Sequence, residues 1–456
     1  MKNFIKLMII FSLLPVLSGC KKEDDFLNTK PNQALFVPST LQDLQSLLNY
    51  QSIFNGGAPG INEIASDDYY VTPEALISQS NLEINGYEWA KKVYDAGQSI
   101  NDWNVGYQQA YYANVVLEYL SKVTMTDQQK TDADQTQGGA LFFRAVTFYN
   151  LVQTFAMPYD TQTAGSDLGI PLRLQSNINL PSTRATVQAC YDQVIKDLTA
   201  AVPLLSPTVI NPMTPSQPAA NAMLARVYLA MSNYSKAYQY ADACLNQFSI
   251  LTDYSTLAPT DYAINPNFLS EDIFHAAQGG YAITIPNYVA IADSNLYRSY
   301  AVNDLRLNKC FIIRDGLPYF VGTYDPQGYD YAGLATDEVY LIRAECNARQ
   351  GNLTNALNDL NTLLVKRWKP GAFIPYTAGT ADQALALILS ERRKELVFRG
   401  LRWTDLRRLN KDNRFALTLI RRVNGTVYSL PPNDPRYAWP IPDNEISTSG
   451  IQQNPR

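Results

Sequence analysis

Residues 221–230 read NAMLARVYLA, and residues 234–245 read YSKAYQYADACL. In both stretches, small and large apolar residues recur three and four positions apart, which is the spacing of one face of a helix. Alanines at these positions allow two helices to approach closely, and Ser232-Asn233 supplies a turn between them. This part of the chain is therefore predicted to form two packed helices.

The same design recurs elsewhere in the chain. Residues 339–345 read VYLIRAE and are followed by Gly351, Ala356 and Leu360. Residues 107–121 with 138–155, and residues 185–205, show weaker versions of the pattern. Together they resemble tetratricopeptide helix pairs. We therefore predict a mainly α-helical protein, built on a tetratricopeptide-like repeat scaffold. The repeats are expected at about 98–155, 185–248, 338–367 and 381–410, within one domain covering 31–456.

Two long stretches interrupt this pattern, at about 50–97 and 250–335. They are rich in Gly, Pro, Asn, Asp and Tyr, and show little helical periodicity. Residues 250–335 hold 10 of the 30 tyrosines, about twice an even share. Long loops inside a compact protein are usually functional or disordered, and the aromatic content argues against disorder. We expect these excursions to form the ligand-binding side.

The first 19 residues have the pattern of an export signal. Lys2 and Lys6 precede an apolar segment from Leu7 to Leu17, which is too short to cross a bilayer. Leu17-Ser18-Gly19-Cys20 follows and resembles a bacterial lipobox, which predicts cleavage before Cys20 and lipidation of its thiol. Residues 20–30 contain an acidic cluster, expected to be a solvated tether or a signal for export to the cell surface.

The composition excludes several classes of function. The whole chain has a net charge of −5, and removal of the signal with its two lysines leaves −7, which disfavours a nucleic-acid partner. Cys190, Cys244, Cys310 and Cys346 are widely spaced, so no zinc site or disulfide framework is predicted. His275 is the single histidine and lies in an apolar, strand-like stretch, which favours a structural role.

Residues 391–408 carry alternating charges. Glu391 and Glu395 lie one helical turn apart among arginines, which raises the possibility of an active site. The pattern is more typical of ion pairs that fix two helices on either side of Gly400. We predict this structural role.

Distinct motifs occur along nearly the whole chain. They are Asp25-Phe26-Leu27, Trp103 to Tyr107, Ala113-Asn114, Arg144-Ala145 with Tyr149 and Phe155, Gly169 to Leu172, Arg184 before Tyr191 to Leu198, Glu391 to Phe398, Gly400, Arg402-Trp403, Asp405 to Arg408, Trp439 to Pro442, Glu445-Ile446, and Gln453 to Pro455. The order of these motifs resembles the SusD/RagB family of lipoproteins. One departure is Arg399, where the family commonly has an acidic residue, and this change is expected to alter a local ion pair.

This resemblance implies a lipoprotein of the outer membrane that faces the outside through its acylated Cys20. It would bind glycans, or in some members peptides, and deliver them to a SusC-like TonB-dependent transporter. No cofactor or metal is implied, and the protein is not expected to be an enzyme. A tetratricopeptide scaffold that binds only proteins remains an alternative.

Aromatic faces stack on sugar rings, and neighbouring polar side chains bind hydroxyl groups. Tyr69 and Tyr70 are adjacent, so on extended backbone they point in opposite directions. Core packing is the competing interpretation for each aromatic residue, and neighbouring aspartates alone are weak evidence for calcium binding or glycoside hydrolysis. The candidate ligand-binding residues are Asp67, Asp68, Tyr69, Tyr70, Trp89, Tyr281, Tyr288, Tyr297 and Arg298.

Overall fold

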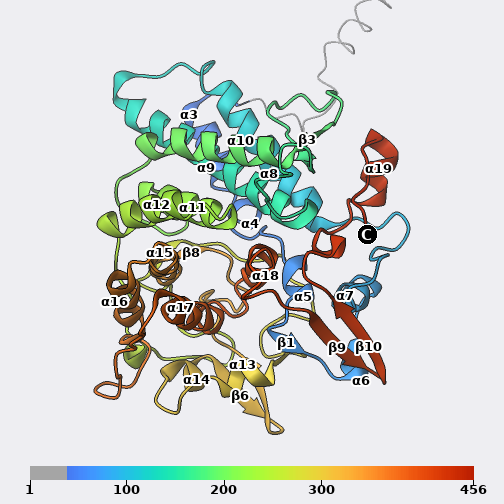
Figure 1. Cartoon of the computed structure of the whole chain (residues 1–456). Helices are drawn as coiled ribbons and strands as arrows, with labels where there is room; N and C mark the ends of the chain where they lie inside the picture. The colour runs from blue at the N-terminus through green and yellow to red at the C-terminus, as the bar shows by residue number, and fades with distance from the viewer. Residues whose placement is uncertain (1–37) are drawn as a thin grey trace, which may run out of the picture.

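The long helices of the chain form a stack in which neighbours along the sequence also pack side by side (Figure 1). The computed structural model describes residues 38–456. Each helix packs on the next, and α17 also packs on α15. The helices of the stack are α8 (Asn101–Tyr119), α9 (Lys130–Phe155), α10 (Val187–Ala201), α11 (Gln217–Ala230), α12 (Tyr234–Gln247), α15 (Thr336–Arg349), α16 (Leu353–Leu364) and α17 (Ala381–Glu395). The predicted mainly helical fold is confirmed.

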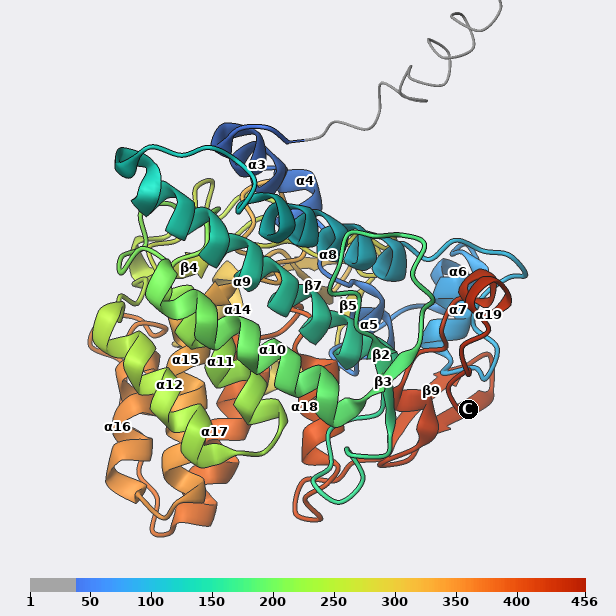
Figure 2. The same ribbon diagram turned by 90° about the horizontal axis from the view of Figure 1, so that it is seen from above.

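The α11–α12 pair shows why these helices approach closely. Ala222 and Ala225 of α11 and Ala237 and Ala241 of α12 are all buried, so the backbones meet without bulky side chains between them. Ser232 has a φ of +57° in the tight turn, and the Asn233 side chain caps α12 by accepting from the Lys236 amide. Seen from above, α9, α10, α11 and α12 run side by side (Figure 2).

The second excursion lies between α12 and α15, although these two helices pack against each other. Residues 248–335 therefore leave the stack and return to it. They contain short regular elements, which periodicity did not predict. These are η3 (Tyr254–Thr256), β4 (Asp272–Phe274), β5 (Ile291–Ala292), α13 (Ser294–Arg298), α14 (Leu305–Lys309), β6 (Phe311–Arg314), β7 (Leu317–Phe320) and β8 (Leu334–Ala335).

The first excursion joins the second through a sheet of order β1-β5-β7-β6. Strand β1 (Tyr69–Tyr70) pairs antiparallel with β5, with Tyr69 opposite Ala292. The excursions thus form one unit on the side of the helical stack, despite lying far apart in sequence. The remaining elements of the first excursion are α4 (Gln51–Phe54), α5 (Ile61–Ala65), α6 (Pro73–Leu76) and α7 (Asn81–Tyr87), and α3 (Leu41–Leu48) precedes them and packs on α8 and α9.

The C-terminal segment closes the side of the molecule that carries α5 and α7 (Figure 1). It comprises α18 (Arg402–Leu409), the hairpin of β9 (Leu419–Val423) and β10 (Thr426–Leu430), η4 (Pro435–Tyr437) and α19 (Asp443–Ser449). Elsewhere β2 (Leu168–Pro171) pairs with β3 (Arg184–Thr186), and η1 (Asp127–Gln129) and η2 (Val202–Leu204) are single turns. No helix within residues 38–456 combines the length and apolar character needed to cross a membrane.

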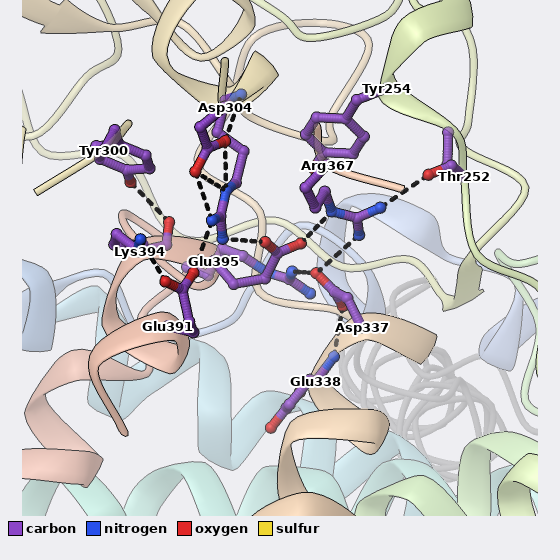
Figure 3. A network of polar contacts seen from close by, with 12 residues as sticks. Thr252, Tyr254, Tyr300, Asp304, Asp337, Glu338, Arg367, Glu391, Lys394 and Glu395 are labelled. Atoms are coloured by element: carbon purple, nitrogen blue, oxygen red, sulfur yellow. Dashed lines mark hydrogen bonds and ion pairs between the residues drawn. The ribbon is translucent and has the colours of Figure 1, made fainter. Parts of the chain in front are cut away.

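A buried network of ion pairs fastens the second excursion to the repeats (Figure 3). The Arg367 guanidinium, fully buried after α16, lies 2.9 Å from Glu271 of the excursion and 2.6 Å from Glu395 of α17. Arg306 of α14 binds Glu391 and Glu395 at 2.7 Å each. These contacts confirm that the charges of residues 391–408 form structural ion pairs. Arg399, the departure from the family pattern, pairs with Asp337 of α15.

Candidate functional site

A cleft of about 360 Å³ opens where the two excursions meet the beginning of α8. Four stretches of the chain form it, at 52–58, 80–82, 98–105 and 279–281. The lining comprises Ser52, Gly56, Gly57, Ala58, Ser80, Leu82, Gln98, Ser99, Asn101, Asp102, Val105, Gly279, Gly280 and Tyr281. Most polar groups in this lining are uncharged hydroxyls, amides and backbone groups.

Backbone pairing between the excursions builds the wall of the cleft. Ala58 and Gln278 form a parallel bridge, in which the Ala58 amide donates to the Ala277 carbonyl at 3.2 Å and the Gly279 amide donates to the Ala58 carbonyl at 2.7 Å. A Cβ on Gly60 would lie 2.0 Å from the Gly279 carbonyl oxygen. The close approach of the two backbones therefore requires glycine at position 60.

Tyr281 and Asp102 meet at the base of the cleft. The Tyr281 hydroxyl donates to Asp102 Oδ2, and the Ile61 amide donates to Asp102 Oδ1 at 3.0 Å. Burial raises the pKa of Asp102 above its usual range, although both hydrogen bonds act in the opposite direction. Burial and the charge of Asp102 raise the pKa of Tyr281, so its phenol stays protonated and serves as the donor.

A helix cap also links the excursions beside the cleft. The Ser80 side chain caps α7 by accepting from the Glu83 amide, and the Glu83 carboxylate in turn accepts from the Ser80 amide. The other oxygen of Glu83 accepts from the Ile283 amide at 3.0 Å. The Glu83 carboxylate thus stabilises both the start of α7 in the first excursion and the turn after Tyr281 in the second.

Three tyrosines of the second excursion are exposed. The chain turns at residues 281–285 and again at 285–288, which leaves Tyr288 with 55% of its surface exposed. Tyr262 and Tyr329 are also about half exposed, and the Tyr262 ring lies against Gly328. Asn287 donates to the Asp261 carbonyl at 3.2 Å, so these three segments form one surface, the tyrosine rim (Tyr262, Tyr288, Tyr329).

The structure places the predicted aspartates in ion pairs rather than in the cleft. Arg402 binds both oxygens of Asp67 at 2.6 and 2.9 Å, and Arg393 binds Asp68 at 3.2 Å. Although burial opposes its charge, the two arginines hold the pKa of Asp67 well below its usual range. Burial raises the pKa of Asp68 to about 6. These contacts anchor β1 to α17 and α18.

Two predicted aromatic residues lie in the core. Tyr69 donates to the Ile64 carbonyl, and the Trp89 indole N–H donates to the Ala65 carbonyl at 3.0 Å. Both side chains are 3% exposed, and the guanidinium of Arg421 lies 4.5 Å above the Trp89 ring. Neither ring offers a face to a ligand in this structure, which corrects their assignment to a binding surface.

The other candidates have different surroundings. Tyr70 is half-buried on β1, Tyr297 packs its ring against Phe311, and Arg298 is exposed at the end of α13. Of the nine candidates, Tyr281 lines the cleft and Tyr288 belongs to the tyrosine rim.

Several residues of the site were not found from the sequence. Asn101 and Asp102 stand directly before Trp103, which is buried. The polar residues Ser99, Asn101 and Asp102 at the start of the helix were the available signal. Tyr262 and Tyr329 belong to the tyrosine-rich excursion but gave no local sign of exposure.

The cleft has the chemistry of a binding site. Asp102 is the only acidic residue among the described residues that line the cleft. Its two oxygens already accept hydrogen bonds from the Tyr281 hydroxyl and the Ile61 amide. Hydrolysis of a glycosidic bond ordinarily uses two carboxyl groups that flank it. The lining instead offers donors and acceptors for hydroxyl groups beside an aromatic ring.

Comparison with known proteins identifies relatives over most of the chain. A family model described as starch-binding associating with outer membrane matches residues 25–229, and a SusD family model matches residues 336–456. SusD-like protein P2 of Formosa agariphila is 24% identical, over 88% of this chain and 90% of the relative.

Solved structures of similar fold cover nearly the whole chain. A SusD superfamily protein from Bacteroides thetaiotaomicron has a TM-score of 0.75 at 24% identity, covering 91% of this chain and 100% of the other. A putative sugar binding protein from Bacteroides vulgatus has a TM-score of 0.73 at 21% identity, covering 92% and 99%. A laminarin binding SusD-like protein has a TM-score of 0.65 at 18% identity, covering 90% and 97%. By its two family-model matches, which together cover most of its length, this chain belongs to the SusD/RagB family.

Proposed function

We propose that this protein binds glycan nutrients in the cleft between its two excursions and does not chemically change them. The observation that carries the proposal is the Tyr281–Asp102 pair in a cleft lined mostly by uncharged polar groups, on the excursion that also carries the tyrosine rim. Sugars present hydroxyl groups and apolar C–H faces, and this lining offers partners for both.

The comparisons support carbohydrate as the ligand class. One matching family model carries a starch-binding description, and one solved structure of the same fold is a laminarin binding protein. These two polysaccharides differ in their linkages, so they indicate a class of ligand without selecting one. Peptide binding and protein binding are the alternative functions.

We further propose that the protein is anchored by a lipid at Cys20 in the outer membrane, facing the outside, and passes its ligand to a SusC-like TonB-dependent transporter. Residues 1–19, Cys20 and the tether to residue 30 lie outside the described residues, so this proposal is supported by the sequence motif and by family membership. The helical stack offers an extended surface for such a partner.

Affinity electrophoresis tests the proposed ligand class. The chain from Lys21 onward is run through gels that contain laminarin, starch or other polysaccharides, and each positive mixture is analysed for products. Retardation without products supports glycan binding and names the ligand. Absence of retardation on every glycan favours peptide or protein ligands, whereas shortened products would overturn the proposal that the protein is not an enzyme.

Variants then test the site. Tyr288→Ala should reduce retardation because it removes an exposed ring of the tyrosine rim. Tyr50→Ala is the matched control, since Tyr50 is 51% exposed but lies outside the rim and the cleft lining. Equal retardation of both variants would remove the tyrosine rim from the proposed binding surface.

A further inference from the structure

A second cavity, of about 310 Å³, lies against α8 and is separate from the cleft. Trp103, Tyr107 and Tyr111 of α8 line it from one element, residues of the loop between β2 and β3 line it from another, and Glu445 of α19 also lines it. In Figure 2 this loop passes beside α8, with α19 nearby.

The two cavities lie on opposite faces of one helix. Trp103, Tyr107 and Tyr111 are spaced by four residues and therefore form a stripe on one face of α8. Asp102 and Val105, which line the cleft, are spaced by three and share another face. At about 100° per residue, the two sets point in roughly opposite directions.

The loop that forms the second cavity is held in place from inside the protein. The Asn114 side chain, 1% exposed, donates to the Arg173 carbonyl at 2.7 Å and accepts from buried Arg144 at 2.9 Å. The Ser176 amide donates to Glu118 at 2.7 Å, and the Tyr107 hydroxyl donates to the Pro171 carbonyl at 2.9 Å. A cavity formed in advance loses less entropy when a ligand binds.

The groups that face this cavity resemble those of the cleft. Tyr111 is half-buried, and in the described part of the chain its hydroxyl and the side chains of Gln175 and Glu445 make no hydrogen bond or ion pair. Arg173 donates to the Asn177 and Leu180 carbonyls of its own loop, so its guanidinium stabilises the loop. The arginine donors that would hold a phosphate are therefore occupied.

We infer that this cavity is a second saccharide site, which takes one or two rings of a neutral glycan against Tyr107 and Tyr111. The inference rests on the proposed function, because it assumes that the ligand is a glycan. Its volume suits a short segment of a glycan chain, and amide and carboxylate oxygens accept from sugar hydroxyls. Two sites on one protein would also strengthen the capture of a polysaccharide through multivalency.

Calorimetric titration measures the number of sites on the chain from Lys21 onward. The probe is laminarihexaose, or the six-unit oligosaccharide of whichever polysaccharide retards the protein in gels. The expected result is two oligosaccharides per chain. Tyr111→Ala should weaken binding to the second cavity at least tenfold and leave the other site unchanged. Tyr288→Ala should weaken only the site formed by the cleft and the tyrosine rim. Gln108→Ala, an exposed change on the same helix outside both cavities, should leave both sites intact.

The outcomes separate this inference from the proposed function. A single site that Tyr111→Ala leaves unchanged would overturn the second saccharide site and leave the cleft as the binding site. A single site that only Tyr111→Ala removes would instead support this cavity and contradict the assignment of the cleft. Absence of binding to every glycan would overturn both.

Discussion

At the scale of single residues, aromatic side chains have two distinct roles that composition does not separate. Trp89 and Tyr288 both belong to tyrosine-rich or irregular stretches, yet one is 3% exposed and the other 55% exposed. The Trp89 indole N–H also donates a hydrogen bond to the Ala65 carbonyl, and the Arg421 guanidinium stacks on the Trp89 ring. The buried ring therefore stabilises the fold, and the exposed ring is available to a ligand.

These roles predict opposite results for the two alanine variants. Trp89→Ala leaves a large cavity and should lower the free energy of unfolding by about 3–5 kcal/mol. Tyr288→Ala should leave stability unchanged and weaken glycan binding. Urea unfolding and affinity electrophoresis measure the two quantities. A Trp89→Ala protein with normal stability and weakened binding would return this residue to the ligand site.

His275 is a second residue whose role follows from its surroundings. Its two ring nitrogens lie 2.6 Å from Asp272 and 3.0 Å from Asp325, and the side chain is buried beneath Phe268 and Tyr331. Burial opposes the imidazolium, but the hydrogen bonds and charges of the two aspartates raise the pKa of His275 to about 9. The predicted structural role thus takes the form of a buried cation between two carboxylates.

This arrangement predicts a stability that falls at alkaline pH. An unfolded histidine titrates near 6.5, so the stabilisation is complete below about pH 6.5 and is lost as the pH rises through about 9. The loss is on the order of 3 kcal/mol. Unfolding free energies of wild type and His275→Gln, compared from pH 6 to 9.5, should converge as the pH rises. Parallel profiles would show that His275 is neutral in the folded protein.

At the scale of elements, the second excursion depends on buried charges for its position on the stack. Arg367 binds Glu271, Glu395 and the Thr252 carbonyl, and its side chain is fully buried. Its neighbour Lys366 forms a longer pair with Asp253 at the surface. The two adjacent cations therefore allow a direct comparison of buried and exposed ion pairs.

Arg367→Met should destabilise the protein by about 3–5 kcal/mol, because it leaves Glu271 buried without its cation and removes one of the two arginines that bind Glu395. Lys366→Met should change stability by less than about 1 kcal/mol. Hydrogen exchange locates the effect, since protection should fall first around residues 252–274 while α9 to α11 stay protected. Uniform loss of protection along the chain would show that the excursion and the stack unfold as one unit.

The helix pairs could be predicted because their signal is local. The spacing of Ala237 and Ala241 reports a packed face within a few residues of sequence. The sheet could not be predicted in the same way, since β1 has two residues and its partner β5 lies more than 200 positions away. Asp102 was missed for a related reason, because its site exists only once Ala58 has paired with Gln278.

At the scale of the whole molecule, two saccharide sites and a membrane anchor would act together. A protein held at the surface presents its sites to long polysaccharides at a fixed height, and several weak contacts then combine into tight capture. Residues 21–37, 17 residues of chain that include the acidic tether, lie between Cys20 and the first described residue, Pro38. Anchoring is therefore expected to be independent of the fold and of glycan binding.

This independence predicts that Cys20→Ala releases the protein from membranes without altering its affinity for glycan. The thiol is the attachment point for acyl chains, and without them the net charge of −7 expected for the mature chain gives no attraction to anionic lipid. Membrane fractionation and gel retardation measure the two properties on the same preparation. Ser18→Ala is the control, since it retains Gly19-Cys20 and should remain in the membrane fraction. Retention of Cys20→Ala in that fraction would show that another part of the chain, or its partner transporter, holds the protein at the membrane.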